Sequence, residues 1–228
     1  MPEAVLPGLR VCEVRDLGRM RYEDALREQE TLVDQRKQGL IPDQLLFVEH
    51  PHVVTMGRNG KGENLLASPE LLERAGIAFY KTNRGGDVTY HGPGQVVGYP
   101  IVDLREWKRD VVGFVRALEQ SIIDALAEFG VCGERLEGHT GVWVSGAKIA
   151  AIGVHISRWV TSHGFALNHT TDLSYFKYIV PCGLHLPVTS LDAQGVSVSR
   201  GDLMRAFSES FARCFNWQVY QPVLENKQ

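Results

Sequence analysis

The sequence predicts an α/β fold of the α+β type, in which helices flank a mixed, largely antiparallel sheet. Residues 22–33, 110–129 and 199–215 repeat apolar positions with a helical period, near the beginning, middle and end of the chain. Residues 141–168 instead have the composition of consecutive strands. No repeat, low-complexity tract or Pro/Ser-rich linker interrupts the 228 residues. We therefore expect a single domain spanning residues 1–228.

The part of the chain before residue 130 predicts strands separated by helices. Ser68 followed by Pro69 is typical of a helix N-terminus, and Gly39, Gly76 and Gly130 are placed to end helices. In order, we expect a strand at 11–14, a helix from 22 to 38, strands at 45–48 and within 49–60, a short helix at 68–76, strands at 77–82 and 96–102, and a helix at 110–129.

The remainder of the chain predicts mostly strands, with one helix at the end. Residues 172–178 fit a helical turn, and the Pro-Cys-Gly sequence at 181–183 fits a tight turn. Ser199 is a suitable N-cap for the last helix, which places Leu203, Phe207 and Phe211 on its core face. The strands are expected at 142–144, 148–156 and 159–168.

Composition excludes several classes of function. The formal net charge of −3 gives the whole molecule no attraction for nucleic acid. The first ten residues lack the features of a signal peptide, and no apolar run is long enough to span a membrane. The four cysteines are far apart and form no CxxC pair. These observations fit a cytoplasmic protein with reduced thiols, and we expect neither nucleic acid nor membrane as a partner.

Residues 84–95, with the sequence RGGDVTYHGPGQ, contain four glycines between two predicted strands. Glycine lets a ligand approach the main chain closely, so we expect a surface loop that binds a ligand, with a long hairpin turn as the alternative. A dinucleotide site is excluded because Val97 stands where the third glycine of that fingerprint belongs and a strand follows. No P-loop sequence occurs either.

Three further residue types could carry chemistry. His50 and His52 are two apart, but no cysteine or acidic residue lies at ligand spacing, so we expect no metal site. Lys148 lies among small and apolar residues, where desolvation would lower its pKa and make it a base; the alternative is an edge-strand lysine that prevents aggregation. Cys182 is presented by a turn, and it is either reactive or structural, whereas Cys12, Cys132 and Cys214 fit packing positions.

Three motifs occur here in order: RGGDVTYHGPGQ at 84–95, GAKIA at 146–150 and PCG at 181–183. Together they resemble the octanoyltransferases of lipoate biosynthesis, over about residues 22–198. The resemblance implies the fold of biotin- and lipoate-protein ligase catalytic domains and no cofactor. It also implies transfer of an octanoyl group from octanoyl-acyl carrier protein to a lysine of lipoyl domains, in 2-oxoacid dehydrogenase complexes and the glycine cleavage H protein.

The resemblance further implies a cysteine–lysine dyad, with Cys182 as the acyl-accepting nucleophile and Lys148 as the group that lowers its pKa and transfers protons. The substrate-binding positions that it implies are Arg84, Gly85, Gly86, Asp87, Val88, Thr89, Tyr90, His91, Ala151, Ile152, Gly153, Gly164, Phe165 and Ala166.

Two alternatives share the fold. An ATP-dependent lipoate- or biotin-protein ligase would need the arginine–glycine segment and the lysine but no nucleophilic cysteine. An inactive acyl-binding protein would need neither Cys182 nor Lys148, and the chain has both. Because acyl carrier proteins are acidic, we also expect a local basic rim drawn from Arg58, Lys61, Lys81 and Arg84.

Overall fold

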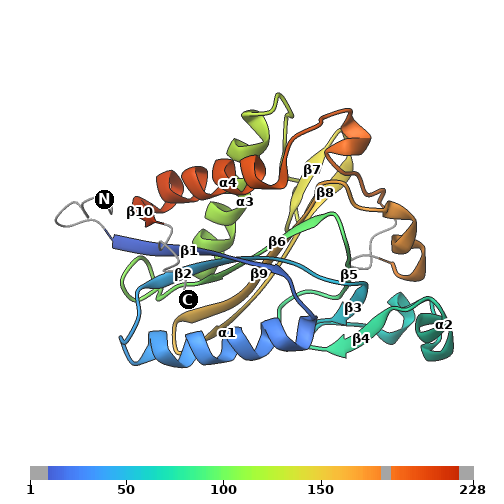
Figure 1. Ribbon diagram of the computed structural model, residues 1–228, viewed down its shortest axis with the longest axis horizontal. Helices are drawn as coiled ribbons and strands as arrows, with labels where there is room; N and C mark the ends of the chain where they lie inside the picture. The colour runs from blue at the N-terminus through green and yellow to red at the C-terminus, as the bar shows by residue number, and fades with distance from the viewer. Residues whose placement is uncertain (1–9, 181–185, 221–228) are drawn as a thin grey trace, which may run out of the picture.

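The computed structural model describes residues 10–180 and 186–220, which form two sheets with helices packed on them (Figure 1). The smaller sheet has the order β4 (Ala78–Lys81), β3 (Val53–Met56) and β5 (Val88–His91). The larger one has the order β10 (Trp217–Tyr220), β1 (Arg10–Arg19), β2 (Asp43–Glu49), β6 (Gln95–Ile101), β9 (Val160–Asn168), β8 (Ala147–Ser157) and β7 (Val142–Val144).

Four α-helices and three 3₁₀ helices complete the described part of the chain. The 3₁₀ helices are η1 (Gly62–Asn64), η2 (Leu173–Tyr178) and η4 (Asp192–Gln194). The α-helices are α1 (Tyr22–Lys37), α2 (Pro69–Arg74), α3 (Val111–Ala127) and α4 (Arg200–Phe215). None of the described helices is long and apolar enough to cross a membrane.

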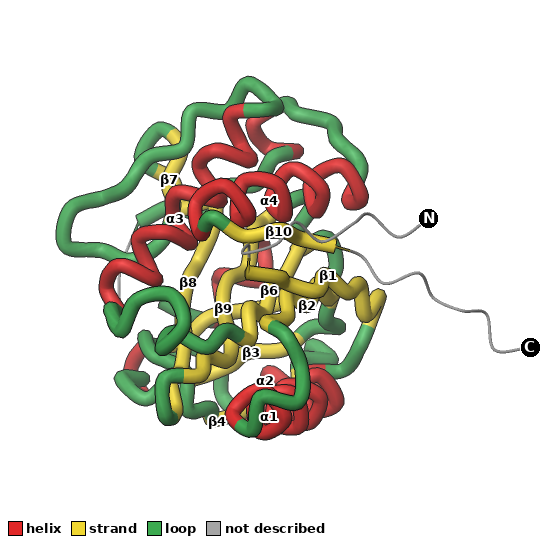
Figure 2. Tube along the Cα trace, turned by 90° about the vertical axis from the view of Figure 1, so that its left-hand side faces the viewer, coloured by secondary structure: helices red, strands yellow, loops and turns green. Residues whose placement is uncertain are grey.

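Strand β2 shows why helices cover both faces of the large sheet. Its central side chains are all apolar and alternate in direction, so that Leu45 and Phe47 join one hydrophobic core while Leu46 and Val48 join another. Helices α3 and α4 pack on the first face and α1 packs on the second, as Figures 1 and 2 show. The sheet is therefore the middle layer of three.

The small sheet has a core of its own beside one end of this sandwich. Leu72 of α2, Val54 of β3 and Tyr90 of β5 are buried in it, and Ile179 joins them from the segment after η2. Strand β5 pairs with β3 antiparallel, whereas β4 pairs with β3 parallel. The other face of β5 turns toward the large sheet, and a cavity lies between the two.

The pairing confirms the predicted mixed, largely antiparallel sheet. Strand β1 is parallel to β2 and to β10, and the other four pairings among the described strands of the large sheet are antiparallel. The predicted helices are confirmed, and Ser68, Asp110 and Ser199 each cap a helix N-terminus through the side chain. The turn predicted at 181–183 lies outside the described residues.

Two predictions about elements were incomplete or wrong. Strand β10 was not predicted, although it lengthens the sheet by pairing with β1. Residues 84–95 are not simply a surface loop, because residues 88–91 within them form β5, whose four side chains are all buried. Pairing with β3 satisfies the backbone of this segment and makes it a wall of the cavity.

Candidate active site

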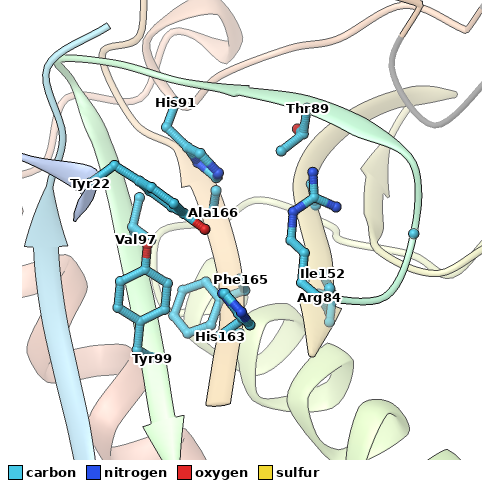
Figure 3. Close-up of a pocket in the computed structure, with 14 residues that line it drawn as sticks. Tyr22, Arg84, Thr89, His91, Val97, Tyr99, Ile152, His163, Phe165 and Ala166 are labelled. Carbon is cyan, nitrogen blue, oxygen red and sulfur yellow. The ribbon is translucent and has the colours of Figure 1, made fainter. Parts of the chain in front are cut away.

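A cavity with an empty volume of about 460 Å³ lies between the small sheet, α1 and the large sheet (Figure 3). Ten of the fourteen residues predicted to bind the acyl substrate line it. We call this cavity the acyl pocket, after the substrate that these residues are predicted to bind. These ten are Arg84, Gly86, Thr89, His91, Ala151, Ile152, Gly153, Gly164, Phe165 and Ala166.

The alternation of side chains along β5 explains two of the four predicted residues that do not line the pocket. Thr89 and His91 point into the acyl pocket, whereas Val88 and Tyr90 point to the opposite face and into the core of the small sheet. Residues 88–91 were predicted to be part of a loop. Because they form a strand, their side chains alternate between the acyl pocket and the core of the small sheet.

Gly85 and Asp87 support the pocket from outside its lining. The amide of Gly85 donates a hydrogen bond to the carbonyl of Val154 on β8, at 2.8 Å. The carboxylate of Asp87 accepts hydrogen bonds from the amides of Lys61 (3.1 Å) and Val88 (2.7 Å), and from the side chain of Asn64. These contacts attach the Arg84 segment to the large sheet on one side and to η1 on the other.

Arg84 is buried, with 7% of its surface exposed. Its Nη2 donates hydrogen bonds to the carbonyl oxygen of Thr55 (2.6 Å) and to its Oγ1 (2.9 Å), and its Nη1 donates to the carbonyl of Gly85 (3.0 Å). The guanidinium is therefore held in a fixed position at the pocket wall. The expectation that Arg84 belongs to an exposed basic rim was wrong, whereas Arg58, Lys61 and Lys81 are exposed.

His91 is neutral in this environment. Burial, followed by the nearby charges of His50 and Arg84, holds its pKa well below the usual value for histidine. The Nδ1 of His91 lies 3.2 Å from Oε1 of Gln95, and because an amide oxygen only accepts, this nitrogen carries the proton and donates it. The predicted pocket histidine can therefore accept a hydrogen bond through Nε2 but carries no charge near neutral pH.

The floor of the acyl pocket consists of small residues on β8 and β9. Ala151 lies opposite Ala166 in the ladder, and Gly153 lies opposite Gly164. The room above them depends on their size, because a side chain here would occupy the pocket or collide with the backbone. A Cβ atom built on Gly153 would lie 2.8 Å from the carbonyl oxygen of Gly85.

Lys148 lies at a second cavity that adjoins the acyl pocket. Thr89, Ala151 and Ala166 line both cavities, so the two spaces meet along these three residues. Lys148 is 7% exposed, and its Nζ lies 4.7 Å from the centre of the Trp143 ring. Strand β8 lies between β9 and β7, so the alternative of an edge-strand lysine is wrong.

The backbone of Lys148 is held by the segment that follows residue 185. Its amide donates a hydrogen bond to the carbonyl of Pro187 (2.8 Å), and its carbonyl accepts one from the amide of Thr189 (2.9 Å). The side chain of Asn168 donates to the carbonyl of Thr189 at 2.9 Å. Cys182 itself lies outside the described residues.

A third cavity, more open, gives Lys148 a connection to the surface. It has an empty volume of about 710 Å³ and is lined by Lys148 together with Asn59, Asp87, His139 and Thr140, among others. It also borders Gly86 and Ile152, two residues of the acyl pocket. Lys148 therefore stands between a narrow, mostly apolar pocket and a polar entrance.

Sequence reasoning missed four residues of the acyl pocket, Tyr22, Val97, Tyr99 and His163. Tyr22 was assigned to the helix stripe and Val97 and Tyr99 to a strand, and no local signal marks them as ligand-binding. His163 lies in a predicted strand, where the sequence fits either a structural role or a place at the substrate rim, and it lines the pocket. These residues reach the site from α1, β6 and β9, so only the tertiary structure identifies them.

The remaining cysteines and histidines fit structural roles in most cases. Cys12 is fully buried in the core, and burial raises the pKa of its thiol. Cys132 is exposed, so its assignment to a packing position was wrong. His50 contacts Met20 and Tyr99, and among the described residues no cluster of histidine, cysteine and acidic side chains could hold a metal ion.

Comparison with known proteins agrees with this geometry. Residues 21–212 match the family model of the lipoyl protein ligase A/B catalytic domain. An octanoyltransferase of Solibacter usitatus (strain Ellin6076) is 63% identical over 211 residues, covering 92% of this chain and 96% of the relative.

Two solved structures show the same fold at low sequence identity. A putative lipoate protein ligase of T. acidophilum with bound lipoic acid superimposes with a TM-score of 0.77 at 15% identity, covering 94% of this chain and 90% of that one. The biotin protein ligase of Aquifex aeolicus gives a TM-score of 0.52 at 10% identity, with coverages of 91% and 69%. The chain therefore belongs to the lipoyl protein ligase A/B catalytic-domain family and, within it, to the octanoyltransferases, which are acyltransferase enzymes.

Proposed function

We propose that the protein transfers an octanoyl group from octanoyl-acyl carrier protein to a lysine of a lipoyl domain, through a thioester on Cys182. The observation that carries this proposal is the position of Lys148, a buried amine between mostly apolar cavities and a polar entrance. In this proposal the saturated acyl chain occupies the acyl pocket, with its carbonyl carbon near Lys148.

Chain connectivity supports Cys182 as the nucleophile. Pro187, which accepts the hydrogen bond from the Lys148 amide, follows Cys182 by five positions in the sequence. Five residues span at most about 18 Å when fully extended. This limit on the chain allows the thiol to approach the Lys148 amine, as a cysteine–lysine dyad requires, because the thiolate is the reactive form and a nearby amine can take its proton.

The proposed reaction has two acyl transfers. In the first, the Cys182 thiolate attacks the donor thioester, its carbon–sulfur bond breaks, and the carrier thiolate leaves with a proton from Lys148. In the second, the acceptor lysine amine attacks the Cys182 thioester, an amide forms, and Cys182 leaves as thiolate while neutral Lys148 takes the proton of the attacking amine. The first step exchanges one thioester for another, and the second forms an amide, which is more stable than a thioester. Neither step therefore needs ATP.

The proposed donor and acceptors reach Lys148 through the polar entrance. Asn59 and Asp87 line this entrance, and Arg58 and Lys61 are exposed near Asn59 in the sequence. In this proposal the two cations attract an acidic carrier protein. The proposed acceptors are the lipoyl domains of 2-oxoacid dehydrogenase complexes and the glycine cleavage H protein. The ligase alternative differs in one observable respect, since it requires ATP and free acid.

Intact-protein mass spectrometry tests this proposal. Incubating the enzyme with octanoyl-acyl carrier protein and no ATP should leave one octanoyl adduct that hydroxylamine removes and that disappears when a lipoyl domain is added. The Cys182→Ala variant should form no adduct, whereas the Cys12→Ala variant should form it normally. Transfer by Cys182→Ala at the wild-type rate would overturn the covalent mechanism and favour direct attack by the acceptor lysine.

A further inference from the structure

The acyl pocket extends away from the Lys148 cavity toward His163. Thr89, which borders the Lys148 cavity, lies at one end of the pocket, and His163 lies at the other beside Tyr99 (Figure 3). If the carbonyl carbon of the acyl group is near Lys148, its methyl end points toward His163. The residues at that end therefore decide how long a chain can be.

His163 is fixed from two directions. The side chain is 2% exposed, and its Nε2 lies 2.7 Å from Oδ1 of Asn83. Burial lowers the pKa of His163 to about 3, so the neutral ring donates its Nε2 proton to the amide oxygen of Asn83. The backbone amide of His163 donates to Oε1 of Gln29 on α1, at 2.8 Å.

His163 has an unusual backbone and lies opposite Pro100. In the β6–β9 register, Gly98 lies opposite Phe165 and Val102 hydrogen-bonds with Thr161, which places Pro100 opposite His163. Proline has no amide proton to donate, so the ladder is interrupted there. The His163 amide turns instead to α1, and the residue adopts a φ of 56°, in the left-handed region that favours glycine.

Beyond His163 lies a separate groove between α1 and the large sheet, with an empty volume of about 720 Å³. Among the described residues, His163 is the one that lines both this groove and the acyl pocket. On β8, Ala151 and Gly153 line the pocket while His155 and Ser157 line the groove, which places all four on the same strand face. The strand surface thus continues from one space into the other, and the imidazole stands between them.

We propose that His163, held by Asn83 and Gln29, closes the acyl pocket and limits the length of the acyl chain that the enzyme transfers. This inference rests on the proposed function and adds a specificity-determining residue to it. A longer chain would have to displace a buried, hydrogen-bonded ring, and the cost would discriminate against it. Removing the ring opens the pocket into a groove in which Leu26 and Val33 offer apolar surface among mostly polar side chains.

The test compares octanoyl- and dodecanoyl-acyl carrier protein as donors. The His163→Gly variant removes the ring, and glycine adopts the φ of this position without strain, so the backbone should be kept. We expect the ratio of kcat/KM for dodecanoyl over octanoyl donor to rise by a factor of ~10 or more. That is the discrimination of a single methylene in an apolar pocket, and it is set below the value for four methylenes because polar side chains also line the groove. An unchanged ratio with octanoyl transfer retained would overturn the proposal.

Two further variants keep the test decisive. Asn83→Ala removes the exposed side chain to which the His163 ring is hydrogen-bonded, and it should raise the same ratio by a smaller factor. If His163→Gly fails to fold, an unchanged ratio in Asn83→Ala overturns the proposal. In the His163→Gly background, Ser157→Trp fills the groove and should bring the ratio back toward the wild-type value. Failure of the proposed function itself would appear differently, as absence of octanoyl transfer by the wild-type enzyme.

Discussion

At the scale of single residues, the site combines charged and titratable groups that the fold keeps out of water. Arg84 is buried against the backbone of Thr55, and Lys148 is buried against Trp143. Burying a charged group costs free energy unless it is paired or hydrogen-bonded. A buried lysine near a ligand cavity is a frequent general base. The two cations differ in role because only lysine can release and accept a proton under ordinary conditions.

Substitution of Lys148 tests that difference. Lys148→Ala should lower kcat/KM for octanoyl transfer by a factor of ~100 or more, the usual contribution of a general acid–base group. Lys148→Arg should not restore activity, because a guanidinium supplies charge but cannot accept a proton. Lys177→Ala, a change in η2 away from the acyl pocket, serves as the matched control. Near-normal turnover by Lys148→Arg would show that positive charge alone is sufficient.

At the scale of elements, the pocket exists because β8 and β9 carry small residues where they face α1 and β5. Neither Gly98 of β6 nor Gly164 of β9 has room for a side chain, and a Cβ on Gly98 would lie 2.2 Å from Cε1 of Phe165. A Cβ on Gly164 would lie 2.1 Å from the carbonyl oxygen of Gly98 and 2.6 Å from Cδ of Pro100. The two strands can therefore stay in register only if this position is glycine.

Gly164→Ala should consequently destabilise the fold. Relief of the collision requires the backbones of β6 and β9 to separate, and overpacking of this kind costs about 1–3 kcal/mol. Gly62→Ala is the matched control, because no heavy atom lies within 4 Å of the Cβ that it would add. Urea denaturation of both variants measures the effect, and equal free energies of unfolding would show that β9 adjusts without strain.

At the scale of the whole molecule, the acyl pocket lies where α1, the small sheet and the large sheet meet. Three histidines from different segments are buried there, His50, His91 and His163. Burial lowers the pKa of each, to about 4 for His50 and about 3 for His163. The assembled fold thus excludes protons that the unfolded chain would bind.

This predicts that stability falls as the pH is lowered. Below the unfolded histidine pKa of about 6.5, the unfolded state binds protons that the native state does not, so the free energy of unfolding decreases until the native groups titrate. His50 alone should account for a loss of order 3 kcal/mol between about pH 6.5 and pH 4. Denaturation of the wild type and of His50→Gln at several pH values measures this contribution, and parallel pH profiles would contradict it.

Much of the fold was accessible from local pattern. The period of apolar residues located α1, α3 and α4, and capping residues located α2; Ser68 and Ser199 marked the helix starts at which their side chains act as caps. The order of the three motifs indicated the family that comparison later confirmed. Helix period and capping depend on residues close together in the chain, and the motifs are read from the order of residues alone. The sequence by itself therefore determined these features.

The tertiary structure decided what depends on distant pairing. Whether residues 88–91 are loop or strand depends on β3, more than 30 positions earlier, and that pairing separates Thr89 and His91 from Val88 and Tyr90. Tyr22, Tyr99 and His163 reach the pocket only because helix packing and strand register bring their segments together. Local sequence does not reveal such contacts, because a tyrosine on the apolar face of a helix fits the same periodic pattern whether it packs in a core or lines a substrate pocket.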